Sequence, residues 1–405
     1  MREDDDNSEA AATRQLSGKV VIVVTHVRGL GPSHHLETFL TERCRKVLSI
    51  YHPLIYEASM KSQYRLFENG VLVATGEHSL RGPEAAIRFE EVMLTIAWVR
   101  RFAPRSDVFF GVDALNCISG ILLRVTRCTR RVIFYVIDWS PKRFDSRILN
   151  GIYHLSDRAA VLLSNEIWNV SPVIDQGRWH GTFWTFIGKF AKKRTKIVGI
   201  GVAQVDDELV NGIRSPYRLV YLGHLLEKQG LQLVIKALPE IALSFGDVDL
   251  VVIGDGPYQV VLQELAESVG IAERITFLGY VEDENEVLRL LGSASVGVAP
   301  YLELEDSFTR FADPGKLKNY LAAGLSIVMT RVPHNADLLE KSGCAILVKD
   351  TAEEVADAVC RLLSEDSTER SSRRAKALSL MKGLDWVSVF SSALVPVTNE
   401  QRLRS

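Results

Sequence analysis

A glycine and a lysine at the start of a helical stretch form the pattern in this chain with the clearest chemical use. The stretch DPGKLKNYLAAG spans residues 313–324, and Gly315 stands where a helix would begin. The free amide groups and the positive dipole end of a helix attract phosphates, and Lys316 and Lys318 would add charge beside them. The stretch therefore predicts a diphosphate site, to which we assign Asp313, Pro314, Gly315, Lys316 and Asn319.

A second glycine-rich turn follows an apolar run earlier in the same half of the chain. VIGDGP (252–257) places Gly254 and Gly256 on either side of Asp255, and Pro257 can begin the next helix. Such a turn lets the backbone approach a ligand closely. Taken alone, it is equally a simple connection from strand to helix.

A third loop offers cations. YLGHLLEKQG (221–230) follows another apolar run with Gly223, and it carries His224 and Lys228. Their side chains could reach the same phosphates as the helix start. The alternative is a solvated loop without a ligand.

Polar residues also follow apolar runs near the start of the chain. THVRGLGPSHH (25–35) contains Arg28, Gly29, Gly31 and His34, which we place on the acceptor side. Gly29 and Gly31 begin like a dinucleotide-binding fingerprint, but His34 stands where the third glycine belongs. No acidic residue ends the second apolar run, so a nicotinamide dehydrogenase is disfavoured. No GxxxxGK[ST] stretch occurs, so a P-loop enzyme is disfavoured too.

Short β-branched runs alternate with helical periodicity, which predicts an α/β protein with parallel sheets. In the first half we expect strands at 19–25, 46–50, 108–111, 131–137, 159–164, 167–171 and 196–200 and an antiparallel hairpin at 64–75. In the second half we expect strands at 218–223, 248–254, 275–279, 296–301, 326–330 and 345–348. The helices there are expected near 229–244, 257–269, 284–292, 315–323, 335–341 and 352–363.

The length of 405 residues also favours two hydrophobic cores. We expect a disordered acidic tail at 1–18, a Rossmann-like domain at 19–205, a second at 206–380, and an amphipathic helix within 381–405 that crosses back to the first domain. Open sheets of this kind bind ligands beyond the carboxyl ends of their strands, so two such domains would face a central cleft.

The order of motifs in the second half resembles the donor domain of glycosyltransferase family 4, the retaining GT-B enzymes. The resemblance covers about 217–365 and includes RITFLGYV (274–281) between the two glycine loops and the lysine helix. It implies a hexosyltransferase that uses a nucleotide-sugar donor in polysaccharide biosynthesis. Gly254, Asp255 and Gly256 would lie beside the nucleotide, and Gly315 and Lys316 beside the diphosphate.

Two residues depart from the family pattern. Many members have a glutamate at the position of Asn319 and another eight residues earlier, where this chain has Phe311. Asparagine supplies no carboxylate for two ribose hydroxyls, so the donor contacts must differ. The resemblance also places Asp138, at the end of FYVIDWSP (134–141), beside the transferred sugar.

A retaining transfer needs charge stabilisation at the departing diphosphate more than a strong base. We therefore assign the catalytic work to Asp138, His224 and Lys228. No metal-binding acidic pair accompanies the motifs, so we predict metal-independent chemistry without a cofactor.

Composition limits the partners and the compartment. The net charge of −2 gives no global attraction to nucleic acid. The five cysteines form no CxxC pair, which fits a reducing cytoplasm: Cys44, Cys117, Cys128, Cys344 and Cys360. Residues 179–196 interleave aromatic and basic residues, so peripheral contact with the inner face of a membrane stays open, as does a glycan or lipid-linked acceptor. Oligomeric state cannot be read from the sequence.

Two alternatives share the predicted fold. A sugar-nucleotide epimerase or hydrolase would consume its donor without an acceptor. A noncatalytic module would bind the nucleotide sugar and turn nothing over, which the loss of two carboxylates at Phe311 and Asn319 allows.

Overall fold

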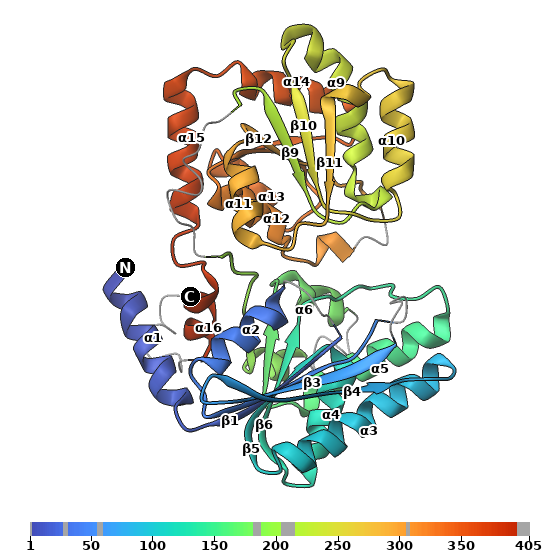
Figure 1. The fold of residues 1–405 in the computed structure, drawn as a ribbon, viewed down its shortest axis with the longest axis vertical. Coiled ribbons are helices and arrows are strands. Elements are labelled where there is room, and N and C mark those ends of the chain that lie inside the picture. Colours follow the sequence, from blue (N-terminus) through green and yellow to red (C-terminus); the bar gives the residue numbers. More distant parts are fainter. Residues whose placement is uncertain are drawn as a thin grey trace. The chain divides into compact units, whose positions relative to one another are not determined.

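The chain divides into two compact units. The computed structural model describes residues 2–26, 31–54, 60–180, 188–203, 215–304 and 308–394. Unit 1 comprises Met1–Gly199 and Trp386–Ser405, and unit 2 comprises Ile200–Asp385. These divisions fall a few residues from the expected boundaries at 205 and 380. Each unit consists of a sheet flanked by helices (Figure 1).

Unit 1 is built on a mixed sheet with the strand order β4-β3-β2-β1-β5-β6-β7-β8. All neighbouring strands pair in parallel except β2 with β3 and β3 with β4. The central strands are continuously apolar and buried, as expected for strands covered on both faces. The bounds are β1 (Val20–Thr25), β2 (Lys46–Tyr51), β3 (Lys61–Glu68), β4 (Val71–Ser79), β5 (Ser106–Val112), β6 (Thr129–Val136), β7 (Glu166–Asn169) and β8 (Thr195–Ile197).

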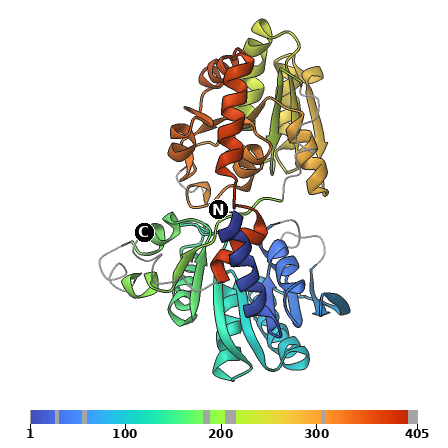
Figure 2. The same cartoon turned by 90° about the vertical axis from the view of Figure 1, so that its left-hand side faces the viewer.

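Helices of unit 1 form two groups. The helices α3 (Glu84–Phe102), α4 (Ala114–Val125) and α5 (Arg147–Leu163) pack side by side. A second group contains α1 (Arg2–Leu16), α2 (Pro32–Thr41) and α16 (Trp386–Leu394), and both views show α1 beside α16 (Figures 1 and 2). The short α6 (Val173–Arg178) follows β7.

The first residues differ from the expectation of a disordered tail. They form α1, which buries Ala12 and Leu16 and packs on α16. The helix α16 is the amphipathic segment predicted near the end of the chain, and the ring of Trp386 stacks on His35 of α2 with centroids 4.4 Å apart. Contacts that link both ends of the chain therefore order a segment that composition alone marks as solvated.

The predicted hairpin is confirmed, and one predicted strand is wrong. Asn69 and Gly70 have φ values of 50° and 82°, the positive angles that a tight turn between β3 and β4 requires. The run AAVLLS (159–164) was expected to be a strand, but it forms the last turns of α5. A short apolar run looks the same in a strand and in a helix, and the long helix beginning at Arg147 decides between them.

Unit 2 is a parallel sheet with the strand order β11-β10-β9-β12-β13-β14, and its six expected strands are confirmed. The strands are β9 (Arg218–Leu222), β10 (Asp249–Ile253), β11 (Ile275–Gly279), β12 (Val296–Ala299), β13 (Ser326–Thr330) and β14 (Ala345–Val348). The expected helices are α9 (Leu231–Ser244), α10 (Gln259–Ser268), α11 (Glu284–Gly292), α12 (Gly315–Ala322), α13 (Ala336–Lys341) and α14 (Ala352–Leu363). Short 3-10 turns occupy η1 (Glu227–Gln229), η2 (Ala272–Arg274) and η3 (Phe308–Arg310).

One helix of unit 2 was not predicted. The helix α15 (Ser367–Leu380) begins with a capping box, in which Asp366 and Glu369 each bond the backbone of the other. Its only buried residue is Ala377, so its sequence has little apolar periodicity to reveal it. Within the described residues, no helix has the length and apolarity needed to cross a bilayer.

Candidate functional site

Three glycines bring the loops after β9 and β10 of unit 2 into backbone contact. Gly223, Gly254 and Gly256 all have positive φ, at 135°, 127° and 157°. A Cβ on Gly254 would lie 2.2 Å from the carbonyl oxygen of Gly223, and one on Gly256 would lie 2.4 Å from that of Leu225. Only glycine fits these places, so the two predicted loops meet at the carboxyl edge of the sheet.

Lys316 extends from the first turn of α12 to the same edge. A Cβ on Gly223 would lie 3.0 Å from its Nζ, and Nζ donates a hydrogen bond to Oε1 of Gln229 at 2.8 Å. The ammonium group also lies over two buried aromatic rings, with Nζ 4.2 Å from the centroid of Tyr221 and 5.0 Å from that of Tyr301. The predicted phosphate-binding lysine therefore contacts both the first loop and its supporting residues.

The charge of Lys316 is poorly compensated. Among the described residues no carboxylate pairs with it, and the N-terminus of α12 is the end whose dipole disfavours a cation. Burial lowers the pKa of Lys316 from 10.5 to about 7. An anion bound at this edge would replace the missing negative charge and restore the protonated form.

His224 and Lys228 lie in the loop that leads from β9 to α9. His224 is exposed, and its carbonyl oxygen accepts a hydrogen bond from the hydroxyl of Tyr221 at 3.1 Å. Lys228 lies in η1, and its carbonyl oxygen accepts from the amide of Leu302 at 3.1 Å. The imidazole of His224 lies beside Gly256, because a Cβ there would come within 2.8 Å of its Cδ2. The structure thus brings His224 to the glycine loops.

Asp313 and Lys318, both predicted near the diphosphate, pair with each other in the structure. The carboxylate of Asp313 is buried, pairs with Nζ of Lys318 at 2.5 Å and accepts from the amide of Ile200 at 2.8 Å. Nζ of Lys318 also donates to the carbonyl oxygen of Ile200 at 2.5 Å. The pair fixes the chain before α12 to the start of unit 2 and leaves Lys316 as the cation at the helix start.

The remaining predicted donor residues surround α12 and β10. Pro314 is the N-cap of α12, and Gly315 begins the helix, where an added Cβ would lie 3.3 Å from Cγ2 of Ile200. Asn319 is partly buried, and its side chain forms no hydrogen bond with the described residues. Asp255 is exposed, and its carbonyl oxygen accepts from the amide of Leu225 at 2.7 Å.

A residue that the motifs did not reveal holds α12 against the sheet. The hydroxyl of Tyr320 accepts from the amide of Leu222 at 2.8 Å and donates to the carbonyl oxygen of Val298 at 3.1 Å. Its ring lies against Gly297 of β12, where a Cβ would come within 2.7 Å. Tyr320 therefore sets the position of Lys316 relative to the loop after β9.

Unit 1 carries the other predicted residues. Asp138 follows β6, and one of its carboxylate oxygens pairs with the guanidinium of Arg143. Gly31 is the N-cap of α2, and His34 lies in the first turn of that helix, partly buried. Arg28 and Gly29 lie outside the described residues.

A buried charged cluster at the carboxyl ends of β1 and β5 was missed by the sequence analysis. His26 directly follows β1, and its ring bonds Asp113 through Nδ1 and Glu91 through Nε2, the latter at 3.1 Å. Glu91 also accepts from Arg88 at 2.8 Å. Asp113 caps α4 with a φ of 75°, an uncommon angle for a residue with a side chain.

The two histidines of this cluster have pKa values shifted in opposite directions. Burial alone would lower the pKa of His26, but the charge of Asp113 and the hydrogen bonds that the His26 ring donates to Asp113 and Glu91 raise it to about 9. His52 lies with its ring centroid 5.6 Å from that of His26. Burial and the charge of His26 lower its pKa to about 3. The cluster therefore holds one charged and one neutral imidazole.

Comparison with known proteins finds a family model that matches the part of the chain that carries the motifs of unit 2. Residues 216–365 match the family model of the glycosyl transferases group 1. A phosphatidyl-myo-inositol mannosyltransferase of Mycolicibacterium smegmatis is 30% identical over 204 residues, which are 49% of this chain and 50% of that protein. The chain thus spans about half the length of this curated relative.

Solved structures resemble the whole chain. The structure of HepE of Anabaena in complex with UDP superimposes on this chain with a TM-score of 0.63 at 12% identity. The superposition covers 95% of this chain and 99% of the HepE chain. The fold is that of a GT-B glycosyltransferase. WaaG, a glycosyltransferase involved in lipopolysaccharide biosynthesis, shares the GT-B fold with a TM-score of 0.60 at 16% identity. This superposition covers 93% of this chain and 98% of the WaaG chain.

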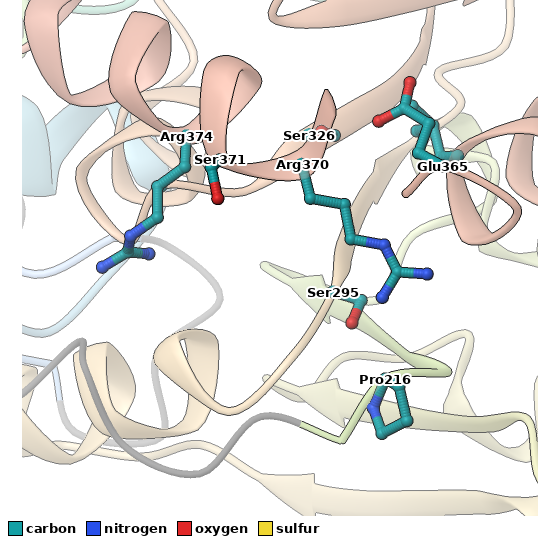
Figure 3. A pocket seen from close by; sticks show the side chains of 9 residues that line it. Pro216, Ser295, Ser326, Glu365, Arg370, Ser371 and Arg374 are labelled. Carbon is teal, nitrogen blue, oxygen red and sulfur yellow. The ribbon is translucent and has the colours of Figure 1, made fainter. Parts of the chain in front are cut away.

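A pocket of about 270 Å³ lies away from the predicted site of this GT-B protein. Pro216, Ser295 and Ser326 line it, and each stands at the amino end of a strand of unit 2 (Figure 3). Arg370 and Arg374 of α15 contribute its cations. Since ligands of such sheets bind at the carboxyl ends of the strands, the donor motifs and this pocket lie at opposite edges of the sheet. In the described part of the chain, no cluster of three or more His, Cys, Asp or Glu residues could hold a metal ion.

Proposed function

We propose that this protein is a glycosyltransferase that moves a hexose-type sugar from a nucleotide-sugar donor to a glycan or lipid-linked acceptor with retention of configuration. The proposal rests on the group 1 match over residues 216–365 and on the arrangement of the motifs within unit 2. HepE, which shares the fold, binds UDP. The matched Mycolicibacterium protein is a mannosyltransferase named for a phosphatidyl-myo-inositol substrate, which supports a lipid-linked acceptor.

The ammonium of Lys316, partly buried and in contact with two aromatic rings, is the observation that carries the proposal. It lies at the helix end that attracts anions, beside two loops that only glycine permits, and it lacks a carboxylate partner among the described residues. A diphosphate fits each of these features, because its charge is compensated by the lysine and by the free amides of the first turn. Burying a lysine there without an anion costs stability.

The same groups would lower the barrier to transfer. As the bond between the sugar and the diphosphate breaks, negative charge develops on the departing phosphate oxygens, and Lys316, Lys228 and the helix amides would stabilise it. His224, exposed beside Gly256, would add a donor to the same phosphates. The departing phosphate would accept the proton of the acceptor hydroxyl, so no strong base is required in unit 2.

Thermal unfolding of the full chain with a panel of nucleoside diphosphates tests donor binding. A ligand that binds the native state raises the melting temperature, and we expect one nucleotide to do so selectively. Lys316→Met should abolish that rise. Lys236→Met is the matched control, because Lys236 is an exposed lysine of the same unit. No rise with any nucleotide would refute the donor site.

A noncatalytic module is the alternative that one observation favours. Asn319 replaces a carboxylate expected from the family pattern, and its side chain contacts none of the described residues through a hydrogen bond. A measurement of donor consumption with and without an acceptor distinguishes the three possible functions. A transferase consumes the donor only with an acceptor, an epimerase or hydrolase consumes it alone, and a binding module leaves it intact. The anomeric configuration of the product, read by NMR, tests retention.

A further inference from the structure

Helix α5 (Arg147–Leu163) of unit 1 exposes a row of apolar residues and buries its one carboxylate. Ile148 is 76% exposed, Ile152 56% and Leu155 66%. Asp157, by contrast, is 2% exposed and binds the guanidinium of Arg178, with Nε to Oδ2 at 2.6 Å. A surface helix ordinarily shows the reverse arrangement, with its apolar stripe facing the core. The outer face of α5 is therefore built for contact with something other than water.

The exposed residues form one continuous stripe. Ile148, Ile152, Leu155 and Leu162 are spaced by four, three and seven residues, which places them on the same side of a helix with 3.6 residues per turn. Leu162 is 38% exposed and continues the stripe to the last turn. We call these four residues the α5 stripe. The stripe is about four helical turns long. A single exposed leucine would need no explanation, but a continuous row of this length does.

The charges of α5 that reach solvent belong to arginines. Asp157 is the only acidic residue within α5, and it is buried. Arg147 is exposed at the first turn and Arg158 is partly exposed. The exposed solvent-facing side of α5 thus combines apolar side chains with arginine and no carboxylate.

Exposed apolar and basic residues also lie next to the end of α5. The guanidinium of Arg194 donates to the carbonyl oxygen of Leu162 at 3.3 Å and also to that of Ser164, so the segment before it lies at the end of α5. In that segment Phe190 is 62% exposed. Three exposed lysines accompany it, none paired with a carboxylate of the described residues: Lys189, Lys192 and Lys193.

We propose that the α5 stripe and the lysines at 189–193 bind the surface of an anionic lipid bilayer. Apolar side chains on a helix lying in the interface enter the headgroup region, and nearby lysines attract anionic headgroups. A second copy of the chain fits less well, because a two-fold contact through this face would bring its arginines and lysines against one another. The lysines belong to residues 179–196, the segment for which membrane contact was left open by sequence.

The position of α5 connects this surface to the chemistry of unit 1. The helix begins after the loop that follows β6, and that loop contains Asp138 and its partner Arg143. A lipid-linked acceptor held at the bilayer surface would therefore present its head group near the carboxyl edge of the unit 1 sheet. This step rests on the proposed function, whereas binding of the bilayer does not.

Sedimentation of the full chain with vesicles tests the proposal. The vesicles contain either phosphatidylcholine alone or phosphatidylcholine with phosphatidylglycerol. We expect binding to the anionic vesicles that weakens with salt. Leu155→Glu should lower the partition coefficient at least about tenfold, because a buried leucine contributes that much and the new charge opposes insertion. Lys192→Glu should lower it by roughly fivefold or more.

Leu243→Glu is the matched control. Leu243 is 89% exposed on α9 of unit 2, so its substitution should leave vesicle binding unchanged. Circular dichroism and the melting temperature establish that each variant folds. The proposal is overturned if the wild-type chain does not bind anionic vesicles, or if the Leu155→Glu and Leu243→Glu variants bind these vesicles equally well. It is also overturned if sedimentation velocity shows a wild-type dimer that Leu155→Glu dissociates, because the stripe would then be an interface between copies.

Discussion

Lys316 is partly buried and His26 is buried, and their surroundings shift their pKa values in opposite directions. The ammonium of Lys316 faces a glutamine and two tyrosine rings, so burial dominates and its pKa falls to about 7. The imidazole of His26 faces Asp113 and Glu91, which outweigh burial and raise its pKa to about 9. A missing carboxylate is the physical difference between the two sites, and it marks Lys316 as the one suited to an anionic ligand.

Replacing Lys316 by methionine should stabilise the protein while removing nucleotide binding. A folded-state pKa of about 7 lies below the unfolded value, so the unfolded chain binds more protons between pH 7 and 10.5, and this group makes stability rise across that window. Lys316→Met should therefore raise the free energy of unfolding near pH 7 by roughly 2 kcal/mol, and less at pH 10. Urea titrations at both pH values measure this. A loss of stability at pH 7 would contradict the assignment of an uncompensated charge.

His26 should make stability fall as the pH rises, which is opposite to the effect of Lys316. Its folded-state pKa of about 9 exceeds the ordinary 6.5, so its stabilising contribution is complete below pH 6.5 and is lost as the pH rises to 9. His26→Gln should remove this dependence, which amounts to at most about 3 kcal/mol. Nitrogen chemical shifts of the imidazole would report the pKa directly. A midpoint near 6.5 would show that Asp113 and Glu91 do not hold the charge.

The sequence could reveal Lys316 because its signals are local: a glycine, a proline and a lysine adjoin an apolar run. His26 was missed because its partners Glu91 and Asp113 lie 65 and 87 residues away. Asp313 is a similar case. Its assignment as a donor-binding residue stays a prediction, and its contacts with Lys318 and with Ile200, the latter across 113 residues, follow no spacing rule.

Among the elements, helix α5 is the one for which the sequence pattern predicts the wrong secondary structure. The run AAVLLS has the composition of a buried strand, but Leu162 and Leu163 are solvent-exposed in the last turn of the helix. The rule that apolar runs belong to the core misled the prediction because this surface departs from that rule. The strands of unit 2 were predictable because each is apolar, short and bounded by turn residues.

The buried pair of Asp157 and Arg178 should be necessary for the packing of α5. Asp157→Ala would leave the guanidinium buried with only its contact to Asp175, at 2.9 Å, for charge compensation. We expect a loss of about 3–5 kcal/mol in the free energy of unfolding of unit 1. Asp145→Ala is the control, since Asp145 is fully exposed just before α5, and it should leave the free energy of unfolding nearly unchanged. Equal effects in denaturant titrations would argue against the pair.

The turn that joins η1 to α9 should tolerate no side chain. Gly230 has a φ of 77°, and a Cβ there would lie 1.7 Å from the carbonyl oxygen of Pro300. Gly230→Ala should lower stability by more than about 2 kcal/mol and shift the loop that carries Lys228. Gly246→Ala should be nearly neutral, because nothing lies within 4 Å of the added atom. Similar melting temperatures for the two variants would show that the turn adapts.

At the scale of the whole molecule, the predicted donor residues all belong to unit 2, and the predicted acceptor residues belong to unit 1. The two doubly wound units and the returning C-terminal helix follow from elements that the sequence shows clearly. The helix α1 does not, because its order depends on packing against α16 from the other end of the chain. Contacts of this kind are set by the folded chain and leave no local pattern.

This separation leads to a prediction about where a nucleotide protects the chain. Hydrogen exchange of the full protein with a saturating nucleoside diphosphate should slow in the loops after β9 and β10 and in the first turn of α12, because their amides would contact the phosphates or be held by them. Lys316→Met should show no such protection, and Lys236→Met should behave as the wild type. Protection around Pro216, Ser295 and Ser326 instead would place the nucleotide in the pocket of Figure 3, at the opposite edge of the same sheet, and would overturn the donor site.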